Sequence, residues 1–77
     1  MKRINVKETE NIWYEIEEWD GKYTVYLMMK DPRTGHTTGA RLTEYGAYKT
    51  MRGAENLVKR DAAMYRWGRP NGYTIVK

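Results

Sequence analysis

The strongest constraint in this sequence is a two-residue turn, Asp20-Gly21, between two segments in which apolar and polar residues alternate. Alternation with a period of two is typical of half-buried β-strands, and it extends over residues 11–19 and 22–30. Asp-Gly favours a type I′ hairpin turn, because both central residues of that turn need positive φ. With this turn Ile16 faces Val25, and the apolar side chains of both strands fall on one face. The turn and the apolar pattern therefore predict the same hairpin.

A second turn signal, residues 31–36, predicts that a third strand continues the sheet. Proline, with φ fixed at about −65°, stands early in this loop, and glycine stands where a left-handed residue ends it. Pairing Asp31 with His36 brings Thr38, Ala40 and Leu42 opposite Met29, Leu27 and Val25, on the face that the first hairpin defines. We therefore predict a three-stranded antiparallel meander with strands near residues 11–19, 22–30 and 36–44.

The sequence after the meander predicts one α-helix, from about residue 51 to about residue 67. Thr50 can cap its first turn, Gly68 lies just past its end, and Pro70 follows. Asp61 falls within the apolar stripe of this helix. We expect either that Asp61 has a partner, such as a Tyr hydroxyl or a basic side chain, or that the helix is rotated so that Asp61 escapes burial.

The two ends of the chain can add to this core. Residues 73–76 predict a short fourth strand after an Asn-Gly turn, and residues 1–9 are either a frayed tail or an edge strand through Ile4 and Val6. We predict a single domain over residues 1–77, because a chain of this length has room for one core. Its class is α+β: a three-stranded antiparallel β-meander packed on one C-terminal α-helix, with a short fourth strand, in the order β-β-β-α-β.

The side-chain inventory limits the chemistry available to this chain. There is no cysteine, and the one histidine, His36, stands beside a hairpin loop, so neither nucleophilic catalysis nor a zinc site has enough groups. Glu15 and Glu17 project from the same face of one strand, whereas hydrolytic carboxylate pairs face each other across a cleft, so we interpret them as a solvated strand face. We expect a protein that is not an enzyme and has no metal, cofactor or small-molecule substrate.

The charge of the chain is distributed unevenly around a net charge of +4. Residues 8–20 carry six Asp and Glu and no base, whereas residues 21–77 carry eleven Lys and Arg against four Asp and Glu. Such asymmetry concerns partners rather than fold. No apolar run approaches the roughly 20 residues that span a bilayer, and the charged N-terminus is not followed by the apolar region of a signal peptide. We therefore expect a macromolecular partner and no membrane.

The outer face of the predicted sheet is the first candidate surface for that partner. It combines residue types that anchor protein interfaces: Trp13, Tyr26, Met28 and Arg41. The alternative is that Trp13 and Met28 only pair across the two strands, and that the N-terminal segment or the final strand covers them.

The far side of the predicted helix is the second candidate surface. Bases at intervals of seven line up along the helix axis and can follow phosphates, while a nearby aromatic side chain can stack on a base. The predicted nucleic-acid-binding residues are Arg52, Lys59, Arg60, Arg66, Trp67 and Arg69. The alternative is a solvated helix face, on which Glu55 partly pairs with Lys59 at i,i+4.

Two resemblances bear on function. Three strands and a packed helix, with Gly46-Ala47-Tyr48-Lys49-Thr50 leading into the helix, resemble the DNA-binding fold of plant ethylene-response factors and of the arm-binding domains of phage and transposon integrases. This likeness covers about residues 12–66, and those families bind DNA with the outer face of the sheet. Short segments also resemble small phage anti-CRISPR proteins that block type I effector complexes: Trp13-Tyr14, Asp20-Gly21, Gly39-Ala40-Arg41 and residues 63–71.

The second resemblance implies a non-catalytic phage-type binding protein that inhibits a host nucleic-acid-handling complex by occluding a binding surface. We adopt this as the functional hypothesis. The alternative is a DNA- or RNA-binding accessory protein that uses the basic helix face. A chain without cysteine suits a reducing compartment, so we expect the protein in the cytoplasm of the host cell.

Overall fold

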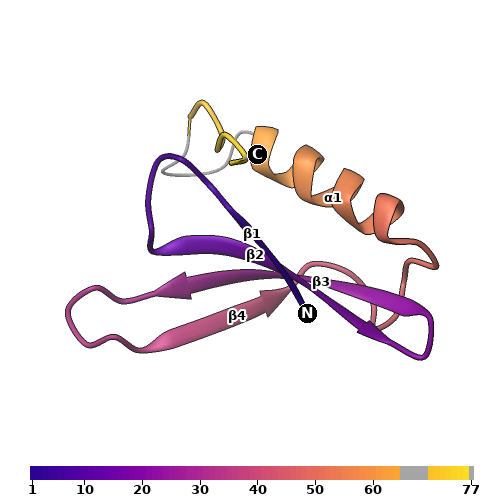
Figure 1. Cartoon of the computed structure of the whole chain (residues 1–77). Coiled ribbons are helices and arrows are strands. Elements are labelled where there is room, and N and C mark those ends of the chain that lie inside the picture. Colours follow the sequence, from indigo (N-terminus) through magenta and orange to yellow (C-terminus); the bar gives the residue numbers. More distant parts are fainter. Residues whose placement is uncertain (65–69, 77) are drawn as a thin grey trace.

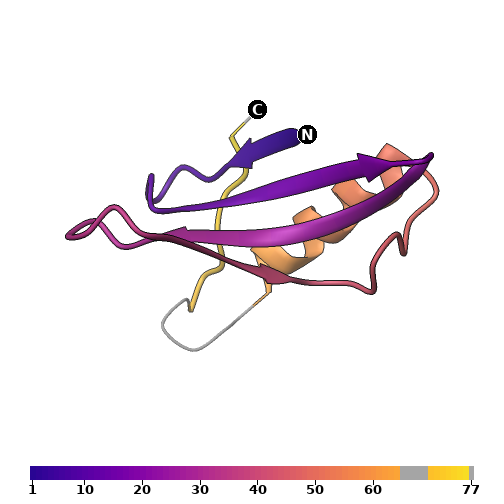
Figure 2. The same ribbon diagram turned by 90° about the horizontal axis from the view of Figure 1, so that it is seen from below.

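A four-stranded antiparallel sheet carries one helix on one of its faces (Figure 1). The computed structural model describes residues 1–64 and 70–76. The strands are β1 (Lys2–Asn5), β2 (Ile12–Trp19), β3 (Lys22–Lys30) and β4 (Thr37–Arg41), in the order β1-β2-β3-β4, and the helix is α1 (Met51–Ala63). Figure 2 shows the outer face of the sheet, with α1 behind it. The predicted α+β class, an antiparallel sheet with one helix, is confirmed.

The first hairpin forms in the predicted register. Asp20 has a φ of 53° and Gly21 a φ of 73°, as the two-residue turn requires. Ile16 faces Val25, and both side chains are fully buried. The Asp-Gly turn and the alternating apolar residues therefore fix the pairing of β2 with β3.

The second hairpin also has the predicted register, but its second strand is shorter than predicted. Asp31 N–H donates to the His36 carbonyl at 2.8 Å, and Leu42 N–H donates to the Val25 carbonyl at 2.9 Å. Beyond Leu42 the chain leaves β3 in an irregular loop. The predicted strand over residues 36–44 is therefore too long, and β4 forms only its central part.

The fourth strand of the sheet comes from the N-terminus and not from the segment after the helix. β1 pairs with β2, which confirms the edge-strand alternative for the first residues. Residues 73–76 form a single bridge, between Ile75 and Val6, and no strand. Within the described residues the predicted β-β-β-α-β order is therefore wrong, because β1 occupies the edge of β2 and the C-terminal segment reaches only the continuation of β1.

The helix begins as predicted and ends earlier than predicted. Thr50 is its N-cap, and the Thr50 hydroxyl accepts a hydrogen bond from Gly53 N–H at 3.1 Å. The helix ends at Ala63, so the predicted extent to residue 67 is too long. The chain returns past this end with Gly72 (φ 68°), where a Cβ atom would overlap the carbonyl oxygen of Ala62. The returning chain at Gly72 therefore lies directly against the last turn of α1.

The core lies between α1 and the inner faces of β2 and β3. Its largest fully buried side chains are Tyr14, Ile16, Val25 and Val58. Asp61 lies in the same contact, is only 4% exposed, and accepts a hydrogen bond from the Tyr14 hydroxyl at 2.5 Å. This confirms the expected Tyr partner. A buried carboxylate that is hydrogen-bonded to β2 fixes how α1 is placed on the sheet.

The helix covers only the middle of the sheet. α1 makes close contacts with β2 and β3 and none with β4, which is exposed along its whole length. Thr38 and Ala40 pair with Met29 and Leu27, so they point to the predicted inner face. No part of α1 lies over them, however, and this is why residues in core register remain exposed.

Replacing Tyr14 by Phe should lower the free energy of unfolding by about 1–3 kcal/mol, because the buried Asp61 carboxylate loses a hydrogen-bond donor. Urea titration followed by circular dichroism measures this. Tyr45→Phe removes the same hydroxyl from a side chain that is 55% exposed, and it should change the free energy by less than about 0.5 kcal/mol. Equal losses in the two variants would contradict the role of the buried bond.

Candidate functional site

Figure 2 shows the face of the sheet opposite α1, and the strand register places all four residues predicted for protein binding on that face. Two neighbouring rows cross the strands: Trp13, Met28 and Gly39 in one, and Arg3, Glu15, Tyr26 and Arg41 in the other. We call these two rows the outer patch. It holds aromatic, sulfur and guanidinium groups on one surface of a regular sheet.

Trp13 belongs to this face but is not displayed on it. The indole is only 5% exposed, because the Arg3 guanidinium lies 4.1 Å from the ring centroid. Its N–H donates to the Glu15 carboxylate at 2.7 Å. The expectation that Trp13 is open to a partner is therefore wrong, and the alternative, in which the N-terminal segment covers it, is confirmed. Within the outer patch Trp13 is therefore a packed residue beside Met28, and not an exposed one.

Tyr26 is half-buried at the centre of the outer patch, with the exposed Arg41 beside it. Burial raises the pKa of Tyr26, the nearby Glu17 and Tyr45 raise it further, and Arg41 lowers it in part. Tyr45 is 55% exposed. It was missed in the sequence because it lies in an irregular loop, which has no periodicity. A hydrogen bond from Gly46 N–H to the Thr24 hydroxyl, at 2.8 Å, anchors that loop to β3.

A hollow of about 640 Å³ lies at the end of the sheet where the β1–β2 loop and the β3–β4 hairpin are located. Its polar lining includes Arg3, Asn5, Thr9, Glu10, Lys30 and Thr37. Arg3 Nε donates to the Asn5 side-chain oxygen at 2.8 Å. In the described part of the chain no carboxylate forms an ion pair with Arg3 or Lys30. These two cations can therefore receive an acidic group of a partner.

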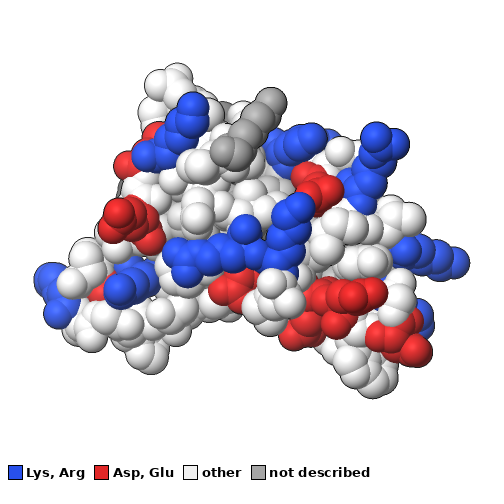
Figure 3. All heavy atoms as spheres, in the orientation of Figure 1, with Lys and Arg blue, Asp and Glu red and all other residues white. Residues whose placement is uncertain are grey.

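Acidic side chains gather at the opposite end of the sheet. Figure 3 shows them over the end of the β2–β3 hairpin. Glu17, Glu18 and Asp20 stand beside Trp19 in the sequence, and Trp19 is 66% exposed. The last part of the acidic segment, residues 17–20, thus lies at the end of the β2–β3 hairpin together with a large aromatic side chain, and it complements a basic surface.

The basic helix face is present in part. Arg52, Lys59 and Arg60 are exposed on α1, whereas Arg66, Trp67 and Arg69 lie outside the described residues. Glu55 does not pair with Lys59; it forms an ion pair with Lys2 of β1.

The hydrogen bond with Lys2 lowers the pKa of the Glu55 carboxyl. Across residues 1–64 and 70–76, no carboxylate forms an ion pair with the three exposed helix cations. Their charge is available to an external anion.

Other kinds of site have little support in the structure. Among the described residues, no group of three His, Cys, Asp or Glu side chains is placed to hold a metal ion. His36 is exposed beside the β3–β4 loop, as predicted. The described residues contain no helix of the length and apolarity needed to cross a membrane.

Comparison of the chain with protein-family models, with curated proteins and with solved structures found no match. The resemblances to integrase arm-binding domains, to ethylene-response factors and to anti-CRISPR proteins therefore stay predictions.

Replacing Lys2 by Gln should raise the pKa of Glu55 towards its ordinary value, because the hydrogen bond with the ammonium group is removed. Carboxyl carbon chemical shifts followed over a pH titration measure this. A lowered folded-state pKa stabilises the fold above the ordinary Glu pKa, and this contribution disappears as the pH falls through the lowered value. Lys7→Gln, a matched change in the same N-terminal segment, should leave Glu55 unchanged. Identical titration curves for the wild type and Lys2→Gln would refute the assignment.

Proposed function

We propose that this chain is a non-catalytic binding protein that inhibits a host nucleic-acid-handling complex by occluding one of its binding surfaces. The observation that carries this proposal is the outer patch, which lies on the face of the sheet opposite α1. Tyr26, Met28 and Arg41 lie there on β3 and β4, next to the packed Trp13 of β2. Aromatic and Arg side chains on a rigid base are typical of the residues that dominate protein interfaces.

The carboxylates at the end of the β2–β3 hairpin favour a partner that normally binds nucleic acid. Such partners hold phosphates with clusters of Lys and Arg. Glu17, Glu18 and Asp20 place carboxylates at the same hairpin end as the exposed Trp19, so they can take the place of phosphates on that surface. Occlusion then follows from competition, with no chemical step. The resemblance to phage anti-CRISPR proteins agrees with this mechanism.

Tyr26→Ala should weaken binding to the partner by more than about fivefold, because loss of an interface anchor costs more than about 1 kcal/mol. A panel of purified type I CRISPR effector complexes serves as the probe, with isothermal titration calorimetry for affinity and a target-DNA competition assay for inhibition. Asn56→Ala, on the exposed side of α1, is the control and should bind like the wild type.

Trp13→Ala is unsuitable for this test, since removal of a buried indole leaves a cavity and destabilises the fold. Binding that survives in a folded Tyr26→Ala, Met28→Ala variant would reject the outer patch as the contact. Failure of the wild type to bind any complex of the panel would reject the anti-CRISPR-like function.

A second candidate function is direct binding of DNA or RNA by the helix face. The observation that favours it is the ion pair of Glu55 with Lys2, which leaves Arg52, Lys59 and Arg60 without a carboxylate partner among the described residues. Three exposed cations on one helix can neutralise phosphates without base specificity.

A triple variant, Arg52→Ala with Lys59→Ala and Arg60→Ala, should bind nucleic acid more weakly than the wild type. The slope of log affinity against log salt should fall by about one unit for each phosphate that the variant no longer neutralises. Fluorescence anisotropy with duplex DNA, single strands and RNA across a salt series measures both. The control removes the same charge from the sheet, at Lys22, Lys30 and Arg41. Equal effects of the two triple variants would show a general charge effect and no helix site.

A further inference from the structure

The free edge of β4 carries backbone groups that have no partner among the described residues. Hydrogen-bonded pairs alternate along an antiparallel ladder, and the bond from Leu42 N–H to the Val25 carbonyl identifies one such pair. The neighbouring residues Thr38 and Ala40 therefore direct their backbone groups to β3. The backbone N–H and C=O groups of Thr37, Gly39 and Arg41 consequently point away from the sheet.

The opposite edge of the sheet is protected, in contrast to β4. Val76 N–H donates to the Asn5 carbonyl at 2.9 Å, and Lys7 N–H donates to the Thr74 carbonyl at 2.9 Å. The side chain of Lys2 adds a charge at the same edge, near α1. β4 has neither proline nor lysine, which are common devices against edge pairing, and all of its residues are exposed. An unprotected edge of this kind is a template for another strand.

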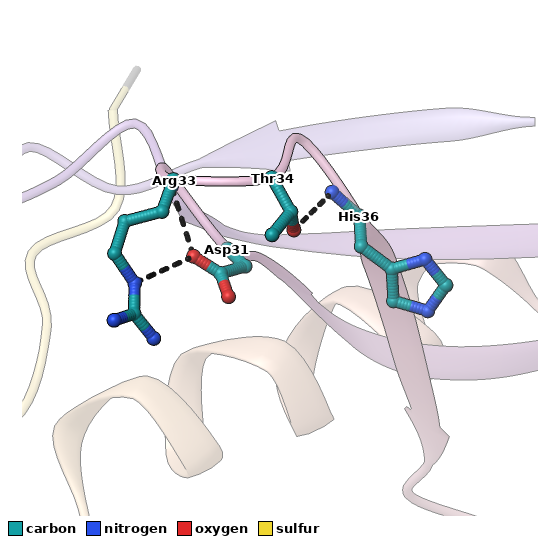
Figure 4. A network of polar contacts seen from close by, with 4 residues as sticks. All are labelled: Asp31, Arg33, Thr34 and His36. Atoms are coloured by element: carbon teal, nitrogen blue, oxygen red, sulfur yellow. Dashed lines mark hydrogen bonds and ion pairs between the residues drawn. The ribbon is translucent and has the colours of Figure 1, made fainter.

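The hairpin loop holds the start of β4 in place (Figure 4). The Asp31 carboxylate accepts a hydrogen bond from Arg33 N–H at 2.9 Å, and Gly35 N–H donates to the Asp31 carbonyl at 2.7 Å. The Thr34 hydroxyl accepts from His36 N–H at 3.1 Å. β4 is therefore already extended and ordered, which lowers the entropy cost of adding a strand to it.

We propose that β4 pairs in antiparallel fashion with β4 of a second copy of this chain, with Gly39 at the twofold axis. This pairing supplies about six backbone hydrogen bonds between the copies, from the three residues of each strand that point outward. Thr37 then faces Arg41 of the second copy, so no like charges stand opposite each other. A Cβ atom at position 39 would lie 2.7 Å from Met28 Sδ, so the Met28 side chain lies over Gly39 on the outer face. Met28 is therefore the side chain beside the twofold axis on that face.

The apolar surface beside β4 also favours a second copy of this chain as the partner of β4. A hollow of about 230 Å³ between α1 and the loop after β4 is lined in part by Leu42, Leu57 and Met64, and Met64 is 51% exposed. Met29, on the inner face of β3, is 43% exposed. A twofold axis perpendicular to the sheet keeps both helices on the same side. The apolar surface next to β4 in one copy would therefore face that of the other, and a single contact covers both the edge and this surface.

Sedimentation velocity from about 10 μM to about 1 mM tests the proposal, since an edge contact of this size is weak and concentration-dependent. The wild type should shift from the mass of one chain towards that of two. Thr37→Glu places a carboxylate opposite Arg41 of the second copy and should strengthen the dimer by about twofold to fivefold, whereas Thr37→Lys should weaken it by a similar factor. Asn56→Glu and Asn56→Lys, on the exposed side of α1, are the matched controls. Neither of them should change the affinity of the dimer.

A further variant, Gly39→Pro, removes one outward N–H without breaking a β3–β4 hydrogen bond, and it should be monomeric. Folding of every variant is checked by circular dichroism, and the Thr37 pair remains decisive if Gly39→Pro does not fold. A wild type that is monomeric up to about 1 mM overturns the proposal. So does a dimer in which Thr37→Glu and Thr37→Lys have the same affinity, or an assembly that grows beyond two copies, because a twofold contact closes on itself.

Discussion

The hydrogen bond between the Tyr14 hydroxyl and the Asp61 carboxylate determines where the helix lies, and the exposed surfaces follow from it. A carboxylate in an apolar contact is costly unless it is hydrogen-bonded, so α1 cannot rotate or slide on the sheet without loss of that bond. The helix is thereby confined to β2 and β3. α1 therefore leaves the edge at β4 uncovered, and it leaves the opposite face of the sheet uncovered because it packs on one face only. The interaction that stabilises the fold therefore also leaves the surfaces that can receive partners.

The outer patch and the β4 edge are compatible with each other, because pairing at the edge uses backbone groups that lie in the plane of the sheet. Arg3 covers Trp13, so the patch is a closed, packed layer on which Tyr26 and Arg41 are displayed. Two copies joined at β4 would present two such patches on one continuous surface. A partner with repeated subunits would then be bound more tightly than by one copy, since the second contact is intramolecular.

Local signals in the sequence by themselves determined the meander and its register. The Asp20-Gly21 turn needs positive φ, the loop over residues 31–36 has its own turn chemistry, and a slip by one residue would expose every apolar side chain of a strand. The sequence also determined that Asp61 needs a partner if it is buried, because its place in the apolar stripe follows from helical periodicity. For the candidate site, alternation alone placed Tyr26, Met28 and Arg41 on one face.

Only the tertiary structure decided which of those residues are covered, and where the elements end. Burial of Trp13 depends on Arg3, and the two meet only when β1 joins the sheet. Glu55 pairs with Lys2 across the fold instead of with the base one helical turn away. Gly72 lies against the end of α1 after a chain reversal that no local pattern encodes. These contacts join residues far apart in the sequence, and their energies depend on packing, whereas turn type and strand register depend on neighbouring residues.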